Sequence, residues 1–211
     1  MEDLAVLEEM EYNGFKYDVE LSLKMGRELE QQIKQIDKNL TTYCPNVPIS
    51  FNSDQQLSAF LYGGCVVREE QETYTFTYKD GHTAPKQRWI KKEYPLPRIL
   101  TPLENSGKKK DGVYSVDVTT LKIIKRQINN GFKTKIINML LKRSQLEKKK
   151  STYCYGTPKL MAEMNWENSL LHPQLNQVVA VTGRLSCSKP NLQNQEYSMQ
   201  RCFISRFPIN E

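Results

Sequence analysis

The sequence has no long apolar run, no clustered cysteines and very little histidine. None of its hydrophobic stretches approaches the roughly 18 residues that a membrane-spanning helix needs, and its first segment, MEDLAVLEEM, is too acidic for a secretion signal. The 5 cysteines are scattered without a C-x-x-C pair and only 2 histidines are present, which excludes zinc fingers and ribbons because these need clustered ligands. We therefore expect reduced thiols in a chain that is neither secreted nor membrane-bound.

Positive charge is concentrated in one part of the 211 residues. The formal net charge is +6, yet residues 120–150 carry ten Lys or Arg and one Glu, which is +9 and leaves −3 for the remainder. Such a segment repels itself unless an anion lies beside it, and each lysine placed on a nucleic-acid phosphate releases a condensed counterion. The segment favours phosphate binding, and the alternative is a solvated basic face without a partner.

Helix signals dominate the first part of the chain. Residues 2–12 have helical spacing and stop at Asn13-Gly14. Asp18 is the expected N-cap of a long helix, and Asn52-Ser53 is the expected cap of a short helix ended by Gly63-Gly64. The apolar stripe of the long helix is Met25, Leu29, Ile33, Ile36 and Leu40.

Residues 65–112 depart from this helical pattern. Residues 73–78 alternate threonine with an aromatic residue, which predicts a strand with one aromatic face. Asp80-Gly81 is a hairpin turn signal, and residues 87–94 are the expected return strand. A β-hairpin inserted into a helical domain is the resulting prediction.

Two further helices are expected in the basic segment. One begins at about Asp117 and stops at Asn129-Asn130-Gly131, and the next ends near Lys150. Their apolar stripes and short joint predict antiparallel packing, with Lys and Arg on the outer faces. Residues 170–181 carry Leu, Val and Ala without helical spacing and are expected to form a strand. The predicted fold class is α+β.

The most specific pattern is the run TGRLSCSKPNLQN at residues 182–194. It resembles the T-G-R-L-S-S-x-x-P-N-L-Q-N motif of family A DNA polymerases, the bacterial polymerase I type, at about ten specified positions. Two departures stand out: Cys187 replaces the second serine, and Gln195-Glu196 replaces the customary I-P.

The resemblance extends over nearly the whole chain, with residues 65–112 as the poorest match. Four more segments agree with the family in order and spacing: residues 4–18, 51–57, 150–153 (KSTY) and 202–207. The resemblance implies three parts: a lead-in segment at residues 1–17, a helical thumb at residues 18–157 with residues 65–112 inserted, and the first strands of a palm at residues 158–211.

Contacts with primer–template DNA are implied by the same resemblance. In this family the basic thumb grips the duplex, and the arginine of T-G-R-L-S, here Arg184, reaches minor-groove acceptors that all base pairs share. The amides of the P-N-L-Q-N stretch would donate to base edges and sugars, with turn stabilisation as the alternative role. The implied DNA-binding residues are Arg143, Lys148, Lys149, Lys150, Ser151, Thr152, Thr182, Arg184, Ser186, Asn191, Gln193 and Asn194.

No catalytic residue is expected in this chain. The family holds two metal ions with aspartates of D-x-S-x-x-E and H-D-E, whereas the last aspartate here is Asp117, before the matching motif. We expect the DNA-binding thumb and partial palm of a DNA-directed DNA polymerase that is inactive alone and binds no cofactor itself. Catalysis would need Mg²⁺ and a second polypeptide or downstream segment with the remaining palm and fingers.

Several alternatives stay open at this point. The chain is one piece of a split polymerase, the stretch before an intron or intein, or a truncated reading frame; the hairpin hints at a viral relative. A non-catalytic DNA-binding module derived from a thumb is the alternative function. An unrelated basic RNA- or protein-binding domain would leave the motif at residues 182–194 unexplained. The expected location is the cytoplasm of a bacterium or a virus-infected host cell.

Overall fold

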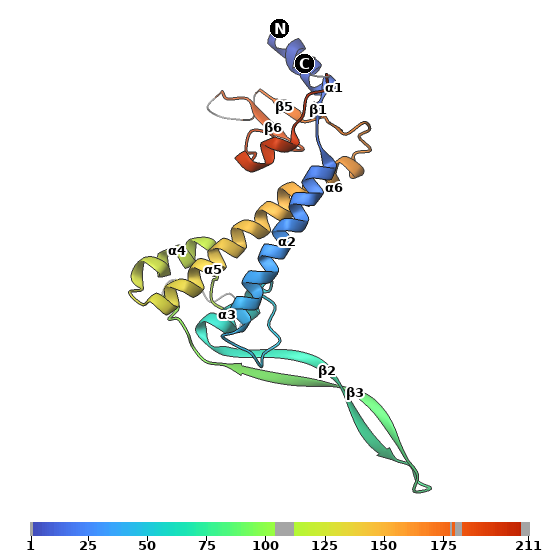
Figure 1. Ribbon diagram of the computed structural model, residues 1–211, viewed down its shortest axis with the longest axis vertical. Helices are drawn as coiled ribbons and strands as arrows, with labels where there is room; N and C mark the ends of the chain where they lie inside the picture. The colour runs from blue at the N-terminus through green and yellow to red at the C-terminus, as the bar shows by residue number, and fades with distance from the viewer. Residues whose placement is uncertain (1, 104–111, 178, 180–182, 208–211) are drawn as a thin grey trace. The chain divides into compact units, whose positions relative to one another are not determined.

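The structure is a computed structural model that describes residues 2–103, 112–177, 179 and 183–207. It combines helices with small antiparallel two-stranded sheets, so the α+β prediction is confirmed. The chain forms two compact units, one of residues 1–35 and 143–211 and the other of residues 36–142. The boundaries between them fall inside helices α2 (Val19–Thr41) and α5 (Gly131–Lys148), and Figure 1 traces the elements in chain order.

The first unit begins with α1 (Glu2–Asn13), which ends where the sequence predicts. Gly14 follows at φ +66°, and a Cβ there would lie 2.8 Å from the Leu171 carbonyl oxygen. This close approach lets β1 (Phe15–Lys16) pair antiparallel with β4 (Leu170–Leu171). The Asp18 carboxylate then accepts a hydrogen bond from the Leu21 amide at 2.8 Å, which confirms Asp18 as the cap of α2.

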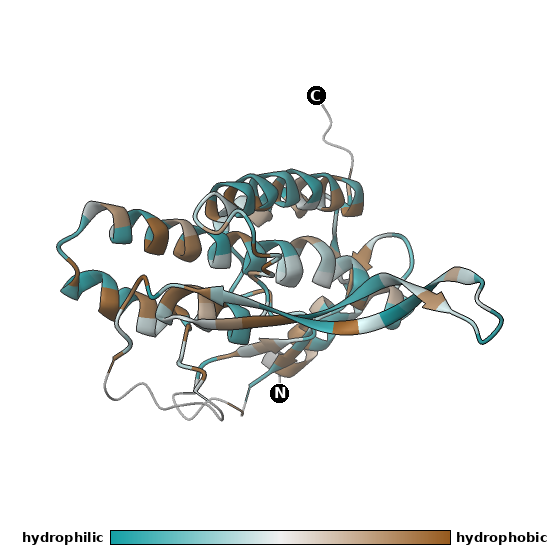
Figure 2. Cartoon of the chain, turned by 90° about the horizontal axis from the view of Figure 1, so that it is seen from below, coloured by the Kyte–Doolittle hydropathy of each residue, from teal (hydrophilic) through white to brown (hydrophobic). Residues whose placement is uncertain are grey.

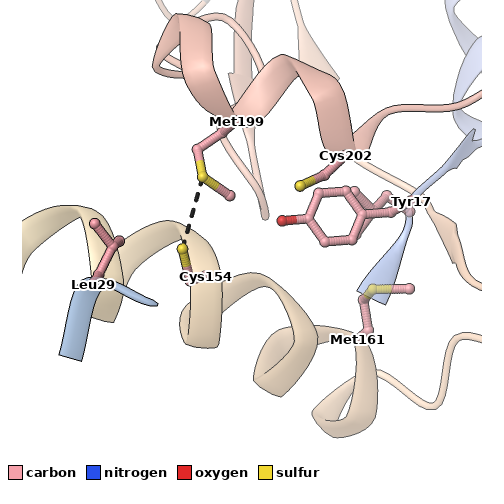
Figure 3. Close-up of a cluster of buried hydrophobic side chains, with 7 residues drawn as sticks. Tyr17, Leu29, Cys154, Met161, Met199 and Cys202 are labelled. Carbon is pink, nitrogen blue, oxygen red and sulfur yellow. Dashed lines mark hydrogen bonds between the residues drawn. The ribbon is translucent and has the colours of Figure 1, made fainter. Parts of the chain in front are cut away.

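The core of the first unit is rich in sulfur. Its buried members come from α2 and the residue before it, η1 (Lys149–Tyr155) and α6 (Gly156–Glu163), β4, and the C-terminal 3₁₀ helix η2 (Tyr197–Cys202): Tyr17, Leu29, Cys154, Met161, Leu171, Met199 and Cys202. Figure 3 shows Cys154 and Met199 facing each other, with their sulfur atoms 3.8 Å apart. Because polarizable thioethers and thiols fill irregular gaps, this core ties the C-terminal segment to α2.

Helical structure continues past the predicted end near Lys150. The α-helix α5 stops at Lys148, but a π-helix, η1 (Lys149–Tyr155), and then α6 (Gly156–Glu163) follow without a break. Pro158 has no N–H for the Cys154 carbonyl four residues earlier, and the Ser22 hydroxyl donates to that carbonyl at 3.0 Å instead. The buried Ser22 of α2 thus supplies the hydrogen bond that Pro158 cannot donate to the Cys154 carbonyl.

The second unit contains the end of α2, α3 (Asp54–Tyr62), α4 (Val118–Gln127) and most of α5. Ser53 and Asp117 cap α3 and α4 by accepting from the Gln56 and Thr120 amides, which confirms the predicted cap at Asn52-Ser53 and the predicted start of the later helix at about Asp117. Its buried side chains include Ile36, Leu40, Phe51, Phe60, Leu61, Leu121, Ile124, Ile136, Ile137 and Leu140. The predicted helical stripes therefore face a common interior within this unit.

The predicted hairpin is present and longer than expected. β2 (Gly64–Thr77) pairs antiparallel with β3 (Thr83–Leu96) along their whole length. The part nearer α3 carries charged residues in place of the aromatic alternation, and cross-strand pairs such as Glu72 with Arg88, at 2.9 Å, support it. The turn that joins the strands is hydrophilic (Figure 2), while Val66 at the base is buried.

The predicted strand at residues 170–181 is wrong in extent. Only β4 and β5 (Gln174–Asn176) form, separated by the buried Pro173, whose ring removes a ladder donor. β5 pairs antiparallel with β6 (Ser186–Ser188), so Leu175 lies opposite Cys187. The remainder of the predicted strand lies largely outside the described residues.

Candidate nucleic-acid interface

The lysine run at residues 148–150 and the loop after β6 meet in one pocket. The pocket has a volume of about 550 Å³ and is lined by Gln145, Leu146, Lys148, Lys149, Tyr153, Asn194 and Glu196. Two contacts join its walls: the Tyr153 hydroxyl donates to the Asn194 carbonyl at 3.0 Å, and Lys149 Nζ lies 3.0 Å from Glu196 Oε1. The structure therefore brings Asn194 beside Lys148 and Lys149, although 44 or more residues lie between Asn194 and these lysines in sequence.

The three lysines differ in their surroundings. Lys148 is exposed. The side chains of Lys149 and Lys150 are only 17% and 19% exposed and are paired with Glu196 and with Glu147, the latter at 2.8 Å. Each of these two lysines thus has an internal carboxylate partner that the sequence pattern did not reveal.

Ser151 and Thr152 lie on the exposed side of the π-helix. The Ser151 hydroxyl donates to the Lys148 carbonyl at 3.4 Å. The π-helix needs a glycine at its end, because a Cβ on Gly156 would lie 2.8 Å from the Ser151 carbonyl oxygen. The wide turn therefore leaves both hydroxyl residues at the surface beside Lys148.

Arg143 does not share this exposure. It is only 7% exposed and engaged within the fold, so the expectation that all basic residues of this segment lie on outer faces is wrong for Arg143. Other basic residues of the segment are exposed as predicted: Lys122, Lys125, Arg126, Lys135, Lys142 and Lys148. Two of them, Lys135 and Lys142, line a second pocket of about 490 Å³ in the other unit.

Arg184 follows a glycine that the backbone requires. Gly183 has φ +68°, a conformation that side-chain-bearing residues rarely adopt. Arg184 itself is exposed, while the Ser186 hydroxyl donates to the Asn176 carbonyl at 3.2 Å and closes the β5–β6 pair. Thr182 lies outside the described residues. Ser186 thus has a structural contact, whereas Arg184, like Lys189, is an exposed cation of this loop.

The amide side chains of the loop divide between two roles. Asn191 Oδ1 accepts from the Gln193 and Asn194 backbone amides at 3.1 and 3.2 Å, and Gln193 Nε2 donates to the Leu185 carbonyl at 3.0 Å. Asn191 and Gln193 therefore stabilise the turn. Asn194 is exposed and lies at the pocket.

Cys187, the first departure from the family motif, has a defined place in this turn. Its thiol donates to the Pro190 carbonyl at 3.3 Å and accepts from the Leu192 amide at 3.4 Å. A serine hydroxyl could make the same two bonds. The substitution therefore keeps the hydrogen-bonding pattern of the loop.

Tyr153, Glu147 and Glu196 are functional candidates that sequence reasoning missed. Tyr153 is the last residue of the KSTY segment, in which only Lys150, Ser151 and Thr152 were predicted to contact DNA. Glu196 belongs to the second departure from the motif. A carboxylate in place of the customary proline could have marked it as a functional candidate. The buried Cys154 thiol is not a candidate for catalysis, since burial raises its pKa to about 11 and keeps it protonated.

The described residues contain no group of three or more His, Cys, Asp or Glu that could hold a metal ion. The donor set of this pocket, lysines and amides with one carboxylate, does not fit Mg²⁺, which needs several oxygen ligands. No helix in the described ranges is long and apolar enough to cross a membrane.

Comparison with known proteins agrees with the motif. The family model of DNA polymerase family A matches residues 95–206. DNA polymerase I of Chloroflexus aurantiacus is 28% identical over 191 residues, which cover 90% of this chain and 16% of that protein. The corresponding protein of Synechocystis is 42% identical over 91 residues, 43% of this chain and 8% of the relative.

A solved structure shares the fold. The POL domain of Pol1 from M. smegmatis, in complex with DNA primer-template and dNTP, is 21% identical with a TM-score of 0.56. The match covers 93% of this chain and 27% of that one. The chain thus spans only a small part of the polymerases it resembles. Since the family model covers more than half of it, this chain belongs to DNA polymerase family A.

Proposed function

We propose that this chain is a duplex-holding portion of a family A DNA polymerase and binds primer–template DNA through its phosphates. The proposed parts are a lead-in segment at residues 1–17, a thumb of long antiparallel helices at residues 18–157 with the hairpin inserted, and the start of a palm at residues 158–211. The observation that carries the proposal is the pocket where Lys148, Lys149 and Asn194 meet.

Charge and geometry support this proposal together. Lys148, Ser151 and Thr152 form an exposed group of donors on one stretch of helix, and Arg184 is exposed on the neighbouring motif loop. Ammonium and hydroxyl groups suit phosphate oxygens, and an exposed guanidinium can reach acceptors in the minor groove. The buried Arg143 is left out of the proposed contact surface.

Catalysis belongs to other residues in this proposal. Nucleotidyl transfer in this family needs metal-bound carboxylates, and this sequence contains no aspartate after Asp117. The chain would hold and orient DNA, while Mg²⁺ and the incoming nucleotide bind to palm and finger segments with the D-x-S-x-x-E and H-D-E motifs. A second candidate function is a DNA-binding module without catalysis. The absence of aspartates after Asp117 favours this candidate as well.

The test is a binding titration of the purified chain with labelled primer–template duplex at several salt concentrations. We expect weak binding without sequence preference, and the logarithm of the binding constant should fall steeply with the logarithm of salt concentration. A binding constant that does not change with salt would refute the proposal. Primer extension with Mg²⁺ and deoxynucleotides should be absent with this chain alone, and extension would refute the assignment of catalysis elsewhere.

A further inference from the structure

The second departure from the family motif places a carboxylate against a lysine of the proposed DNA surface. Glu196 Oε1 lies 3.0 Å from Lys149 Nζ and also accepts a hydrogen bond from the Ser198 hydroxyl at 3.1 Å. One anionic oxygen thus receives an ammonium and a hydroxyl donor together. A phosphate oxygen is commonly bound by the same two kinds of donor.

Glu196 is the one acid in the lining of this pocket, among the residues that the structure describes. The other polar lining groups come from Gln145, Lys148, Lys149, Tyr153 and Asn194. Without the Glu196 carboxylate, the lining would carry two positive charges and several neutral hydrogen-bonding groups. Such a lining suits an anionic group such as a phosphodiester.

The backbone at Glu196 is anchored while its side chain is half exposed. The Glu196 carbonyl accepts from the amide of the fully buried Met199 at 2.8 Å. One residue earlier, Gln195 Nε2 donates to the Asn191 carbonyl at 3.1 Å. The Glu196 side chain is 47% exposed, so its carboxylate can rotate into solvent without movement of the loop.

We propose that this pocket binds one backbone phosphate of nucleic acid and that Glu196 occupies the phosphate position until DNA displaces it. Two anions cannot share Lys149 at hydrogen-bonding distance without mutual repulsion, so the carboxylate must leave when a phosphate enters. The inference rests on the proposed DNA-binding function and adds to it an internal competitor that lowers affinity. DNA must break the ion pair between Lys149 and Glu196 when it binds, and this lowers its affinity.

The test compares four variants with the wild-type chain in duplex-binding titrations at fixed salt. Glu196→Gln keeps the size and hydrogen-bonding ability of the side chain but removes its charge. It should tighten binding by about two- to fivefold, which corresponds to the usual strength of an exposed ion pair. Lys149→Met should weaken binding and reduce the slope against salt by about 0.9, because one phosphate contact is lost.

The double variant separates displacement from a general charge effect. If Glu196 acts through Lys149, then Glu196→Gln should give no gain in a Lys149→Met background. Glu163→Gln is the matched control, since it removes the same charge from an exposed lysine pair on α6 and should leave affinity unchanged. Circular dichroism should show the same fold for all variants.

The outcomes distinguish this inference from the proposed function. If wild-type binding is salt-dependent and Lys149→Met weakens it, but Glu196→Gln has wild-type affinity, the competitor role is wrong while DNA binding stands. An equal gain with Glu163→Gln, or a gain that persists without Lys149, also overturns it. If the wild-type chain binds no duplex at any salt concentration, the proposed function and this inference fail together.

Discussion

Ser22 is a single residue on which several parts of the first unit depend. Its side chain is fully buried, its hydroxyl lies 2.8 Å from the Tyr17 hydroxyl, and it donates to the Cys154 carbonyl. Tyr17 can donate to Ser22 while Ser22 donates to Cys154, so three polar groups are satisfied in one chain. The lysine-bearing π-helix is thereby attached to α2 at the position where Pro158 would otherwise leave a carbonyl unpaired.

The first prediction follows from this chain of hydrogen bonds. Ser22→Ala should lower the free energy of unfolding by about 1–3 kcal/mol, because it leaves the buried Cys154 carbonyl without its donor and removes one hydrogen-bond partner of the Tyr17 hydroxyl. Chemical denaturation followed by circular dichroism measures the change. Ser205→Ala, at an exposed serine, is the control and should change stability little; equal effects of both substitutions would argue against the role of Ser22.

Buried thiols and Tyr17 give the second prediction, which concerns pH. Burial raises the pKa of Cys154 from 9.0 to about 11 and also raises the pKa values of Cys202 and Tyr17. These groups are neutral when protonated, so the unfolded chain loses their protons first as pH rises. For Cys154 this contribution to stability is present below about pH 9 and is lost as the pH rises to about 11, while the contribution of Tyr17 falls only above its ordinary pKa of 10.0.

Unfolding titrations at successive pH values test this linkage. The free energy of unfolding should fall through that range, and Cys154→Ala, although less stable at neutral pH, should show a shallower fall. At neutral pH a thiol reagent should react with the exposed Cys65 well before the other, buried cysteines. Rapid labelling of Cys154 in the folded chain would contradict the account.

At the scale of elements, the β2–β3 hairpin has an outer part that contacts little besides itself. Its strands form a two-stranded sheet, and among its described side chains only those near the base, Val66 and Leu96, are buried. Cation–π contacts such as Lys86 over Phe76, at 3.7 Å, lie along one face. An isolated two-stranded ribbon is marginally stable, so its outer part adds little to the stability of the helices.

The third prediction is that the outer hairpin can be removed. Replacing residues 68–92 by a short Asn-Gly turn should leave the thermal unfolding midpoint within a few degrees of the intact chain, since the buried base is kept. Differential scanning calorimetry measures it. Val66→Asp is the contrasting variant and should destabilise the chain by several kcal/mol because it buries a charge. A large loss of stability on excision would refute this independence.

The helix ends could be predicted from the sequence, but the contacts between distant segments could not. Side chains at Asp18, Ser53 and Asp117 make local caps, which depend only on adjacent residues and are therefore readable. The π-helix depends on Ser22 and Gly26, which lie far away in sequence; a Cβ on Gly26 would come 2.8 Å from the Tyr155 ring. The charged cross-strand pairs of the hairpin and the pairing of Lys149 with Glu196 were missed for the same reason, since they arise from contacts between distant segments. The pairing of Lys150 with Glu147, three residues earlier, is local.

At the scale of the whole molecule, the assignment of Arg184 needs the segments that carry catalysis. In a polymerase reconstituted with those segments, Arg184→Ala should leave duplex affinity nearly unchanged, because lysines supply most of it. Extension should slow by up to about a hundredfold, as expected for a misplaced reacting group. The penalty for a mispaired primer end should also shrink. Single-turnover extension from matched and mismatched primers measures both effects, and wild-type rates would refute the assignment.

The central claim is that phosphates of a nucleic acid bind at the lysine run of η1 and α5. Reversing charge with Lys149→Glu and Lys150→Glu together should weaken binding to all duplex sequences about equally and reduce the slope against salt by roughly 2, because two phosphate contacts are lost. The matched control is a chain with Lys79→Glu and Lys91→Glu. Both lysines lie in the hairpin, outside the basic segment at residues 120–150.

The decisive measurement is therefore a salt-series titration of the charge-reversed chain against duplexes of unrelated sequence, with folding checked by circular dichroism. The account predicts a uniform loss of affinity and a shallower salt slope for the Lys149 and Lys150 variant, and near-normal binding for the control. Unchanged binding by the folded Lys149 and Lys150 variant, or a loss confined to one sequence, would contradict it.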